Sequence, residues 1–367
     1  MGLSPRIEKL DAGNQLIINA GMDLFQRGTT TSVSNAANTY LADRFSFRPA
    51  GITATATMAR STDVPTLAQS GYQYPYSLGL TTTNQVASPG STAVASLAYR
   101  MEGQDYAPIH SKACRLQIWV KSSVVGTYSI NLTNSAITRQ YVSSFTIIAA
   151  NTWEQKSFDI TMDSSGTWLF DNNLGLDIRV NLQVGSGGQT GTLNSWQTTA
   201  AANLGANSHA NLWAGTAGAT FLMTGVSLYE GSFSVGTILP FKRAGKNIQQ
   251  ELSMCQRYAY IVPNNNGFEF MLGMCYSATS GILLAKMPMT MRAAPAFSSV
   301  TSSPIGSFFG VINASGGGVT LSSLVIGGAT ADTVRMALTT ASSLVGGNAT
   351  QLYPITGSSI LGFEAEL

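Results

Sequence analysis

Leu176-Asp-Ile-Arg-Val-Asn-Leu-Gln-Val184 is the stretch of sequence that decides the fold. Apolar side chains occupy every second position in it, and charged or amide side chains stand between them. Successive side chains of a β-strand point to opposite faces, so this alternation predicts a strand with one buried face and one polar face.

The same alternation recurs on both sides of this stretch. It is found at Ile52–Met58, Leu116–Lys121, Tyr128–Leu132, Phe158–Ile160 and Phe221–Tyr229. Residues that favour turns separate these runs at 88–90, 163–166, 171–173 and 185–188. Many short strands without helical patterns between them predict an all-β chain whose first part is a β-sandwich.

The pattern changes after Tyr229. We expect an N-terminal attachment segment over 1–13, the sandwich over 14–232, a linker or ordered crossover over 233–246, and a C-terminal β domain over 247–367. One short helix is predicted near the junction, over Asn247–Tyr258, because Ile248, Leu252 and Cys255 recur at helical spacing. The remainder is poor in charge and rich in glycine turns, which predicts a smaller β-sandwich-like domain.

Composition excludes several classes of function. Charged residues make up 10% of the 367 residues, against about 25% in a typical soluble domain. The net charge of +2 gives no electrostatic footprint for nucleic acid. No stretch is apolar enough for a membrane span, and the polar start MGLSPRIEKLDAG lacks the apolar region of a signal peptide. We therefore expect synthesis in the cytoplasm without a signal peptide, no membrane insertion and no nucleic-acid partner.

Catalytic motifs are not apparent, and we expect no enzymatic activity. His110 and His209 have no nucleophile motif beside them and are interpreted as structural residues. Local carboxylate pairs that could hydrolyse a glycosidic bond are Glu102 with Asp105 and Asp171 with Asp177, and their alternative role is solvation of turns and strand edges. Cys114, Cys255 and Cys275 have no metal-ligand spacing and are expected to be small buried side chains, although a bridge between Cys255 and Cys275 is conceivable.

One metal site is considered. Asp163, Asp171, Asn172 and Asn173 supply oxygen ligands in two turns, which would suit a structural calcium ion. The alternative is that these Asp and Asn side chains make the turns by themselves, and this alternative is favoured.

Aromatic side chains suggest a glycan site. Tyr72, Tyr74 and Tyr76 alternate and would share one strand face, although Pro75 weakens that strand. Trp196 and Trp213 lie in a loop-like polar stretch, where an exposed indole is costly unless it is used or covered. Flat aromatic rings can stack on the apolar faces of sugars, but a buried packing role remains the alternative for all five residues. Trp119 and Trp153, by contrast, fall in alternating strands and are expected to pack.

The chain also resembles the tail-fibre and virion-spike proteins of phages and prophages. The opening Asn14–Gly28 (NQLIINAGMDLFQRG) is similar to their NLIINGGFDVWQRG start, and Tyr40–Phe45 stands in place of YTADRW. Further similar segments are Arg100–Gln104, Leu116–Ser123, Gly126–Tyr128, Asn151–Glu154, Gly166–Trp168, Val226–Gly231, Glu251–Tyr258 and Pro288–Pro295.

This resemblance implies a jelly-roll module like those that bind carbohydrate, followed by a small C-terminal β domain. It also implies a place on the virion surface, as a tail or head appendage, and a homotrimer joined to other virion proteins through its N-terminal segment. Three functions stay open: an adhesin for host cell-surface polysaccharide, a purely structural subunit for decoration, collar or fibre joining, and a glycan depolymerase.

Overall fold

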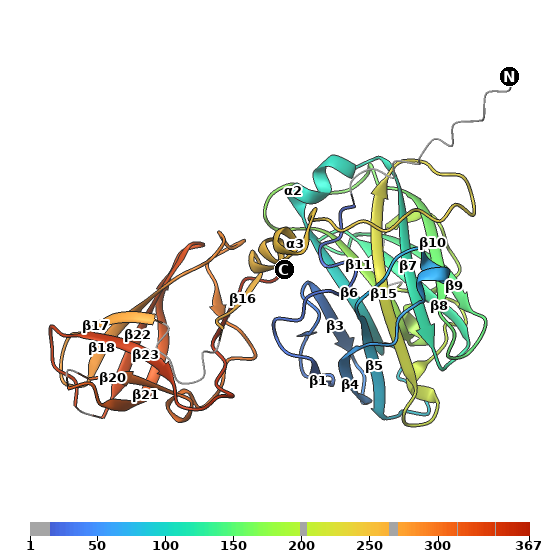
Figure 1. The fold of residues 1–367 in the computed structure, drawn as a ribbon. Helices are drawn as coiled ribbons and strands as arrows, with labels where there is room; N and C mark the ends of the chain where they lie inside the picture. The colour runs from blue at the N-terminus through green and yellow to red at the C-terminus, as the bar shows by residue number, and fades with distance from the viewer. Residues whose placement is uncertain (1–14, 199–203, 264–270, 314, 342) are drawn as a thin grey trace, which may run out of the picture. The chain divides into compact units, whose positions relative to one another are not determined.

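The chain forms two units. The computed structural model describes residues 15–198, 204–263, 271–313, 315–341 and 343–367. One unit comprises residues 1–251 with Leu367, and the other comprises residues 252–366. The first unit is built from two large antiparallel sheets and the second contains a closed β-barrel (Figure 1). The predicted all-β fold class is confirmed, whereas the predicted attachment segment 1–13 lies outside the described residues.

The N-terminal unit is a β-sandwich. Its six-stranded sheet has the order β1 (Thr30–Val33), β4 (Thr55–Ser61), β5 (Ser77–Asn84), β15 (Thr220–Glu230), β7 (Ala113–Ser122), β10 (Glu154–Thr161). Its seven-stranded sheet has the order β13 (Trp196–Thr198), β9 (Arg139–Ile147), β8 (Gly126–Thr133), β11 (Leu174–Val184), β6 (Val94–Glu102), β3 (Phe45–Ala50), β2 (Thr39–Tyr40). Each predicted stretch overlaps one of these strands. A short parallel pair, β12 (Gln189–Thr190) and β14 (Gly205–Ala206), accompanies the second sheet.

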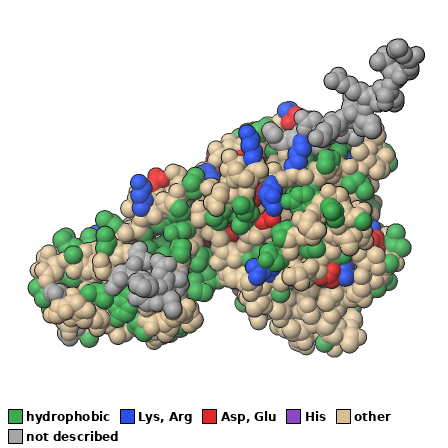
Figure 2. All heavy atoms as spheres, viewed as in Figure 1, with side chains coloured by type: hydrophobic (Ala, Val, Ile, Leu, Met, Phe, Trp, Pro, Cys, Tyr) green, Lys and Arg blue, Asp and Glu red, His purple; other side chains and the backbone are tan. Residues whose placement is uncertain are grey.

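Alternation along each strand fills the space between the sheets. Leu116, Ile118 and Val120 of β7 are fully buried, and so are Ile130 and Leu132 of β8. Burial of each such side chain contributes about 1.5–3 kcal/mol. The opposite faces carry polar side chains, and the visible surface of this unit is mainly uncharged with scattered basic and acidic groups (Figure 2).

A second apolar cluster covers part of the outer face of the six-stranded sheet. Trp119 and Trp153 are buried there with Tyr74 and Leu222, which confirms that these two tryptophans pack. Phe241, from the segment predicted as a linker or ordered crossover, packs against Tyr72 and Tyr74.

Arg115 of β7 fixes the same segment to the sheet. Its side chain is 1% exposed and forms a bidentate ion pair with Asp159 of β10, at 2.6 and 2.8 Å. It also donates to the carbonyl oxygens of Phe233, Ser234 and Thr237. Residues 233–246 are therefore ordered on the sandwich by a charged side chain and by the ring of Phe241.

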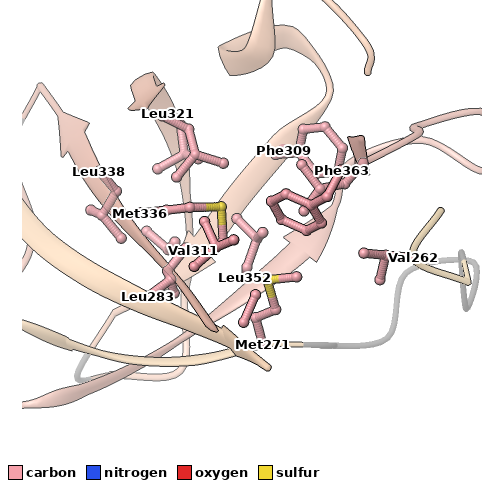
Figure 3. Close-up of a cluster of buried hydrophobic side chains, with 14 of the residues drawn as sticks. Val262, Met271, Leu283, Phe309, Val311, Leu321, Met336, Leu338, Leu352 and Phe363 are labelled. Carbon is pink, nitrogen blue, oxygen red and sulfur yellow. The ribbon is translucent and has the colours of Figure 1, made fainter. Parts of the chain in front are cut away.

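The C-terminal unit contains a barrel rather than the expected small sandwich. The barrel has the order β17 (Met271–Cys275), β18 (Ser280–Lys286), β22 (Thr333–Thr340), β21 (Gly318–Ala329), β20 (Phe309–Ile312), β23 (Ala349–Pro354). Pairing of β17 with β23 closes the barrel. The sequence pattern did not distinguish the two folds, because strands alternate with a period of two in a sandwich and in a barrel alike. Leu283, Met336, Leu338 and Leu352 point into its interior (Figure 3). Beside it lie β16 (Ala259–Ile261), β24 (Gly362–Glu364) and β19 (Ala296–Phe297).

Helices are few and short in the described ranges. They are α1 (Leu67–Ser70), α2 (Gly103–Tyr106) and α3 (Ile248–Gln256). The predicted helix near the junction corresponds to α3, and the Asn247 side chain accepts a hydrogen bond from the backbone N–H of Gln250 at its start, as an N-cap does. Among the described residues, no helix is both long enough and apolar enough to cross a membrane.

Candidate functional site

A groove crosses the outer face of the six-stranded sheet. Strand register places Ala59 of β4 opposite Gly79 of β5, Gly79 opposite Leu222 of β15, and Leu222 opposite Lys121 of β7. These side chains form one row across the strands. The groove above them has a volume of about 650 Å³ and is completed by Arg60, Ser61, Thr62, Asp63, Thr81, Asn151 and Thr220. Ligand pockets commonly measure about 300–1,000 Å³.

Small residues make the floor of this groove. Ala59 has only a methyl group and the buried Gly79 has no side chain, so these two positions place little bulk in the groove. A Cβ atom at Gly79 would lie 3.5–3.8 Å from Ala59, Leu222 and Ser61, which is ordinary contact. The glycine is therefore not required by crowding, and its effect is to leave space above the strand.

A charged pair forms one wall. The Lys121 ammonium group lies 2.6 Å from Oδ2 of Asp63. The indole N–H of the buried Trp153 donates to Oδ1 of Asp63 at 2.8 Å. Both carboxylate oxygens are thus held in place, and Lys121 keeps donor capacity for a ligand because an ammonium group has three N–H bonds.

Two further polar side chains lie at the edge. The Arg60 guanidinium group lies over the Tyr76 ring at 4.4 Å from its centroid. Asn151 has a φ of 56°, a left-handed conformation that Asn adopts more readily than most residues. Its backbone N–H is bound to the Ser122 carbonyl oxygen, and its side chain is exposed at the groove.

This arrangement can bind hydroxyl-rich ligands. Thr81, Thr220, Asn151 and Lys121 offer donors, and Thr and Asn oxygens offer acceptors, around an apolar centre at Leu222. Asp63 is the one carboxylate among the residues that line the groove.

The prediction that Tyr72, Tyr74 and Tyr76 share one strand face is wrong. Residues 72–76 lie between α1 and β5 and belong to no strand, because Pro75 cannot donate to a sheet ladder. Tyr74 is 2% exposed and its ring packs on Tyr72 and Phe241, and burial raises the pKa of its hydroxyl. Tyr76 instead supports Arg60. Of the three, Tyr76 is the one connected to the groove, and its contact is indirect.

The two predicted loop tryptophans have different environments. Trp213 lies in a short 3₁₀ turn (Leu212–Ala214), is 0% exposed and faces Phe47, so it cannot contact a ligand. Trp196 begins the edge strand β13, is half-buried against Trp168 and Tyr141, and donates its N–H to the Thr161 carbonyl oxygen. The structure does not bring either of them to the groove.

The predicted calcium ligands are engaged elsewhere. Both carboxylate oxygens of the buried Asp163 bind the Arg139 guanidinium group. Asp171 is exposed and accepts from the backbone and side-chain N–H groups of Asn173, as in the favoured turn interpretation, and Asn172 is exposed beside it. In the described ranges, no cluster of three or more His, Cys, Asp or Glu side chains could hold a metal ion.

The surroundings of the histidines and cysteines indicate structural roles. His209 is buried, its Nδ1 lies 3.0 Å from the Ser129 hydroxyl, and burial lowers its pKa from 6.5 to about 4. His110 is half-buried against Tyr106. Cys114, Cys255 and Cys275 are buried, as predicted, and the conceivable disulfide between Cys255 and Cys275 is not formed.

The residues that line the groove were largely missed by sequence reasoning. The alternation in Leu116–Lys121 places Lys121 on the same face as Trp119, and this is the one signal that could have been used. Nothing in the sequence pairs Gly79 with Leu222 or brings Asn151 near Asp63.

Comparison with known proteins gives structural similarities only. No protein-family model matches the sequence, and no curated protein matches it. Over 54% of this chain and 22% of the other, the structure is similar to the enzymatically active domain of tailspike protein 4 of bacteriophage CBA120, with 14% identity and a TM-score of 0.29. A family 11 carbohydrate-binding module from Clostridium thermocellum, solved with a β-1,3-1,4-mixed-linked tetrasaccharide, matches over 55% of this chain and 95% of its own, with 11% identity and a TM-score of 0.30. TmCBM61 in complex with β-1,4-galactotriose matches over 60% and 100%, with 9% identity and a TM-score of 0.30. The chain is therefore similar in structure, at low identity, to carbohydrate-binding β-sandwiches and to a phage tailspike domain.

Proposed function

We propose that this chain is a virion surface protein of a phage that binds host cell-surface glycan in the groove of the six-stranded sheet. The observation that carries the proposal is the row Ala59–Gly79–Leu222–Lys121, which makes a floor of small and apolar residues with a charged end. Hydroxyl and amide groups surround this floor. A sugar ring has an apolar face for Leu222 and hydroxyl groups for the polar rim.

Binding suits this groove better than hydrolysis. Glycosidases generally use two carboxyl groups, one on each side of the scissile bond. Asp63 has no second carboxylate beside it in the groove, and Lys121 and Trp153 bind both of its oxygens. Its role in our proposal is to orient Lys121 toward the ligand.

A virion location is supported by the sequence motifs that run in order from Asn14 to Pro295. A low content of charged residues is in keeping with a β-protein that works outside the cytosol. In this proposal the segment 1–13 joins other virion proteins.

The test is adsorption of the purified protein to host cells before and after enzymatic removal of surface polysaccharide. We expect binding that depends on the polysaccharide and that falls about tenfold in Lys121→Met, since a hydrogen bond to a charged group contributes about 1.5–3 kcal/mol. Lys112→Met is the matched control, because Lys112 also forms an ion pair at 2.7 Å, with Glu230, and does not line the groove. Equal adsorption to stripped cells would contradict the proposal.

A structural role is the second candidate, favoured by the outer face of the barrel. Met274, Ile282, Ala337 and Val325 form one row across β17, β18, β22 and β21. Leu272 and Leu284 lie opposite each other beside this row and are 67% and 55% exposed. We propose that copies of the chain pack through this apolar face, as the expected homotrimer would require.

A further inference from the structure

Three arginines converge on the outer face of the seven-stranded sheet. Arg48 lies on β3, Arg100 on β6 and Arg179 on β11. Arg179 lies opposite Ala98 of β6, and Arg100 is two positions from Ala98 on the same strand. Arg48 lies opposite Ser96, which is two positions from Ala98 in the other direction. The three side chains therefore surround one small residue.

The charge of this cluster is not balanced. Asp177 of β11 is the one carboxylate among the charged groups that act on Arg48, beside Arg100, Arg179 and the hydroxyl of Tyr40. Oδ2 of Asp177 lies 2.9 Å from Nη2 of Arg179 and 3.5 Å from Nε of Arg100. Three guanidinium groups and one carboxylate leave a net excess of positive charge in a half-buried place.

Several polar atoms of the cluster have no hydrogen-bond partner among the residues that the structure describes. These are Nη1 of Arg48, Nε of Arg100 and Oδ1 of Asp177, which is 1% exposed. Asn131 and Thr133, on the adjacent strand β8 and also buried, each have an unsatisfied oxygen. A buried polar group without a partner is costly, so a group of them in one place is a position where a polar ligand or water would be stabilised.

The electrostatic surroundings of Arg48 also favour a bound anion. Burial lowers the pKa of Arg48 to about 10, and the positive charges of Arg100 and Arg179 add to the effect. Arg48 is thus charged at neutral pH at a cost that an anion would remove. Arginine side chains suit carboxylate and sulfate groups because their N–H bonds match two oxygens at once.

We propose that Arg48, Arg100 and Arg179 bind the carboxylate or sulfate group of an acidic sugar. The free oxygens of Asp177, Asn131 and Thr133 would accept hydrogen bonds from hydroxyl groups of the same sugar. The sugar part of this inference rests on the proposed glycan binding, whereas the oxyanion part does not. The site lies on the other sheet from the groove and would add a preference for acidic polysaccharide.

The experiment is calorimetric titration of the full-length protein at constant ionic strength with four ligands of defined structure. These are a uronic acid trisaccharide, a sulfated trisaccharide, a neutral trisaccharide and inorganic sulfate. We expect one or both acidic trisaccharides to bind about tenfold or more tightly than the neutral one and than inorganic sulfate. Equal binding of the neutral trisaccharide would overturn the proposal, and binding of sulfate as tight as that of the sugars would overturn its sugar part.

Arg48→Met separates a ligand-binding role from a structural one. Arg48 forms no ion pair with Asp177, so its removal strands no carboxylate and relieves repulsion from Arg100 and Arg179. We expect this variant to lose the preference for acidic ligands while its unliganded melting temperature stays the same or rises. Arg335→Met, on the barrel, is the control for loss of an arginine. A lower melting temperature with unchanged ligand preference would show that Arg48 is structural and would overturn the inference.

The groove variant distinguishes this inference from the proposed function. Lys121→Met is expected to reduce adsorption to cells and to leave the oxyanion titration unchanged. Normal adsorption of wild type together with no preference for acidic ligands would therefore overturn the oxyanion site alone.

Discussion

Arg115 and Asp159 form an ion pair in which the two partners differ in burial. Arg115 is 1% exposed, whereas the Asp159 side chain is 52% exposed. Arg115 also satisfies three carbonyl oxygens of residues 233–237. Arg115→Met should lower the free energy of unfolding by about 3 kcal/mol, because it removes all of these bonds from a buried place.

Asp159→Asn is the comparison for this prediction. It should cost less than Arg115→Met, since the Asp159 carboxylate is solvated, the amide keeps one oxygen acceptor, and Arg115 keeps its three carbonyl acceptors. Urea denaturation of both variants measures the difference. Equal losses would show that the carbonyl contacts of Arg115 contribute nothing.

The buried His209 makes the stability of the sandwich depend on pH. Its pKa is lowered to about 4 by burial, against 6.5 in the unfolded chain. Between these values the unfolded chain holds a proton that the folded chain does not, so stability falls as the pH falls through this window. The loss is about 3 kcal/mol once the pH is below 4.

The measurement is the free energy of unfolding of wild type and His209→Gln between pH 7 and pH 3.5. Other groups titrate in both proteins, so the difference between the two curves isolates His209. The variant should lose less stability than wild type as the pH falls. Parallel curves would contradict the prediction.

At the scale of the strand, Gly79 determines whether the groove is open. A Cβ atom at this position meets only ordinary contacts at 3.5–3.8 Å, and β-branched residues favour strands. Gly79→Val should therefore fold with unchanged or slightly higher stability, by at most about 1 kcal/mol. Its side chain should fill the floor beside Leu222 and reduce adsorption to host cells about tenfold or more, the loss expected if a sugar ring can no longer reach Leu222.

Thr83→Val is the control, at an exposed position of β5 outside the residues that line the groove. Thermal unfolding and cell adsorption of both variants test the prediction together. Full adsorption by a folded Gly79→Val protein would place the glycan elsewhere.

At the scale of the whole molecule, the barrel face bears on oligomeric state. Leu272 and Leu284 expose apolar side chains side by side on β17 and β18. Green side chains are visible on the surface of this unit in Figure 2. A double change to Leu272→Ser and Leu284→Ser should convert a trimer to monomers without unfolding the barrel, because both side chains point away from its core.

Light scattering after size-exclusion chromatography measures this directly. Wild type should have a mass three times that of one chain, and the double variant the mass of one. Ile148→Ser, a change at a 79% exposed residue of the sandwich, should leave the trimer intact. A monomeric wild type would contradict the trimer.

The alternation of apolar and polar residues was enough to predict the strands and the all-β class. Leu176–Val184 and Leu116–Lys121 are strands because side-chain direction along a strand is a local property with a period of two. The helix at Ile248–Gln256 followed from the equally local period of 3.6 residues. The burial of Trp119, Trp153 and the cysteines was also predicted correctly from the sequence.

Pairing between distant strands was decided by the tertiary structure alone. The row from Ala59 to Lys121 needs residue 79 beside residue 222, and the arginine cluster needs residue 48 near residue 179. Trp213 became core and Tyr74 a packing residue because long-range contacts cover them, which is the alternative that the sequence had left open beside a ligand role. Local sequence determines which way a side chain points, and only the folded sheets determine what it meets.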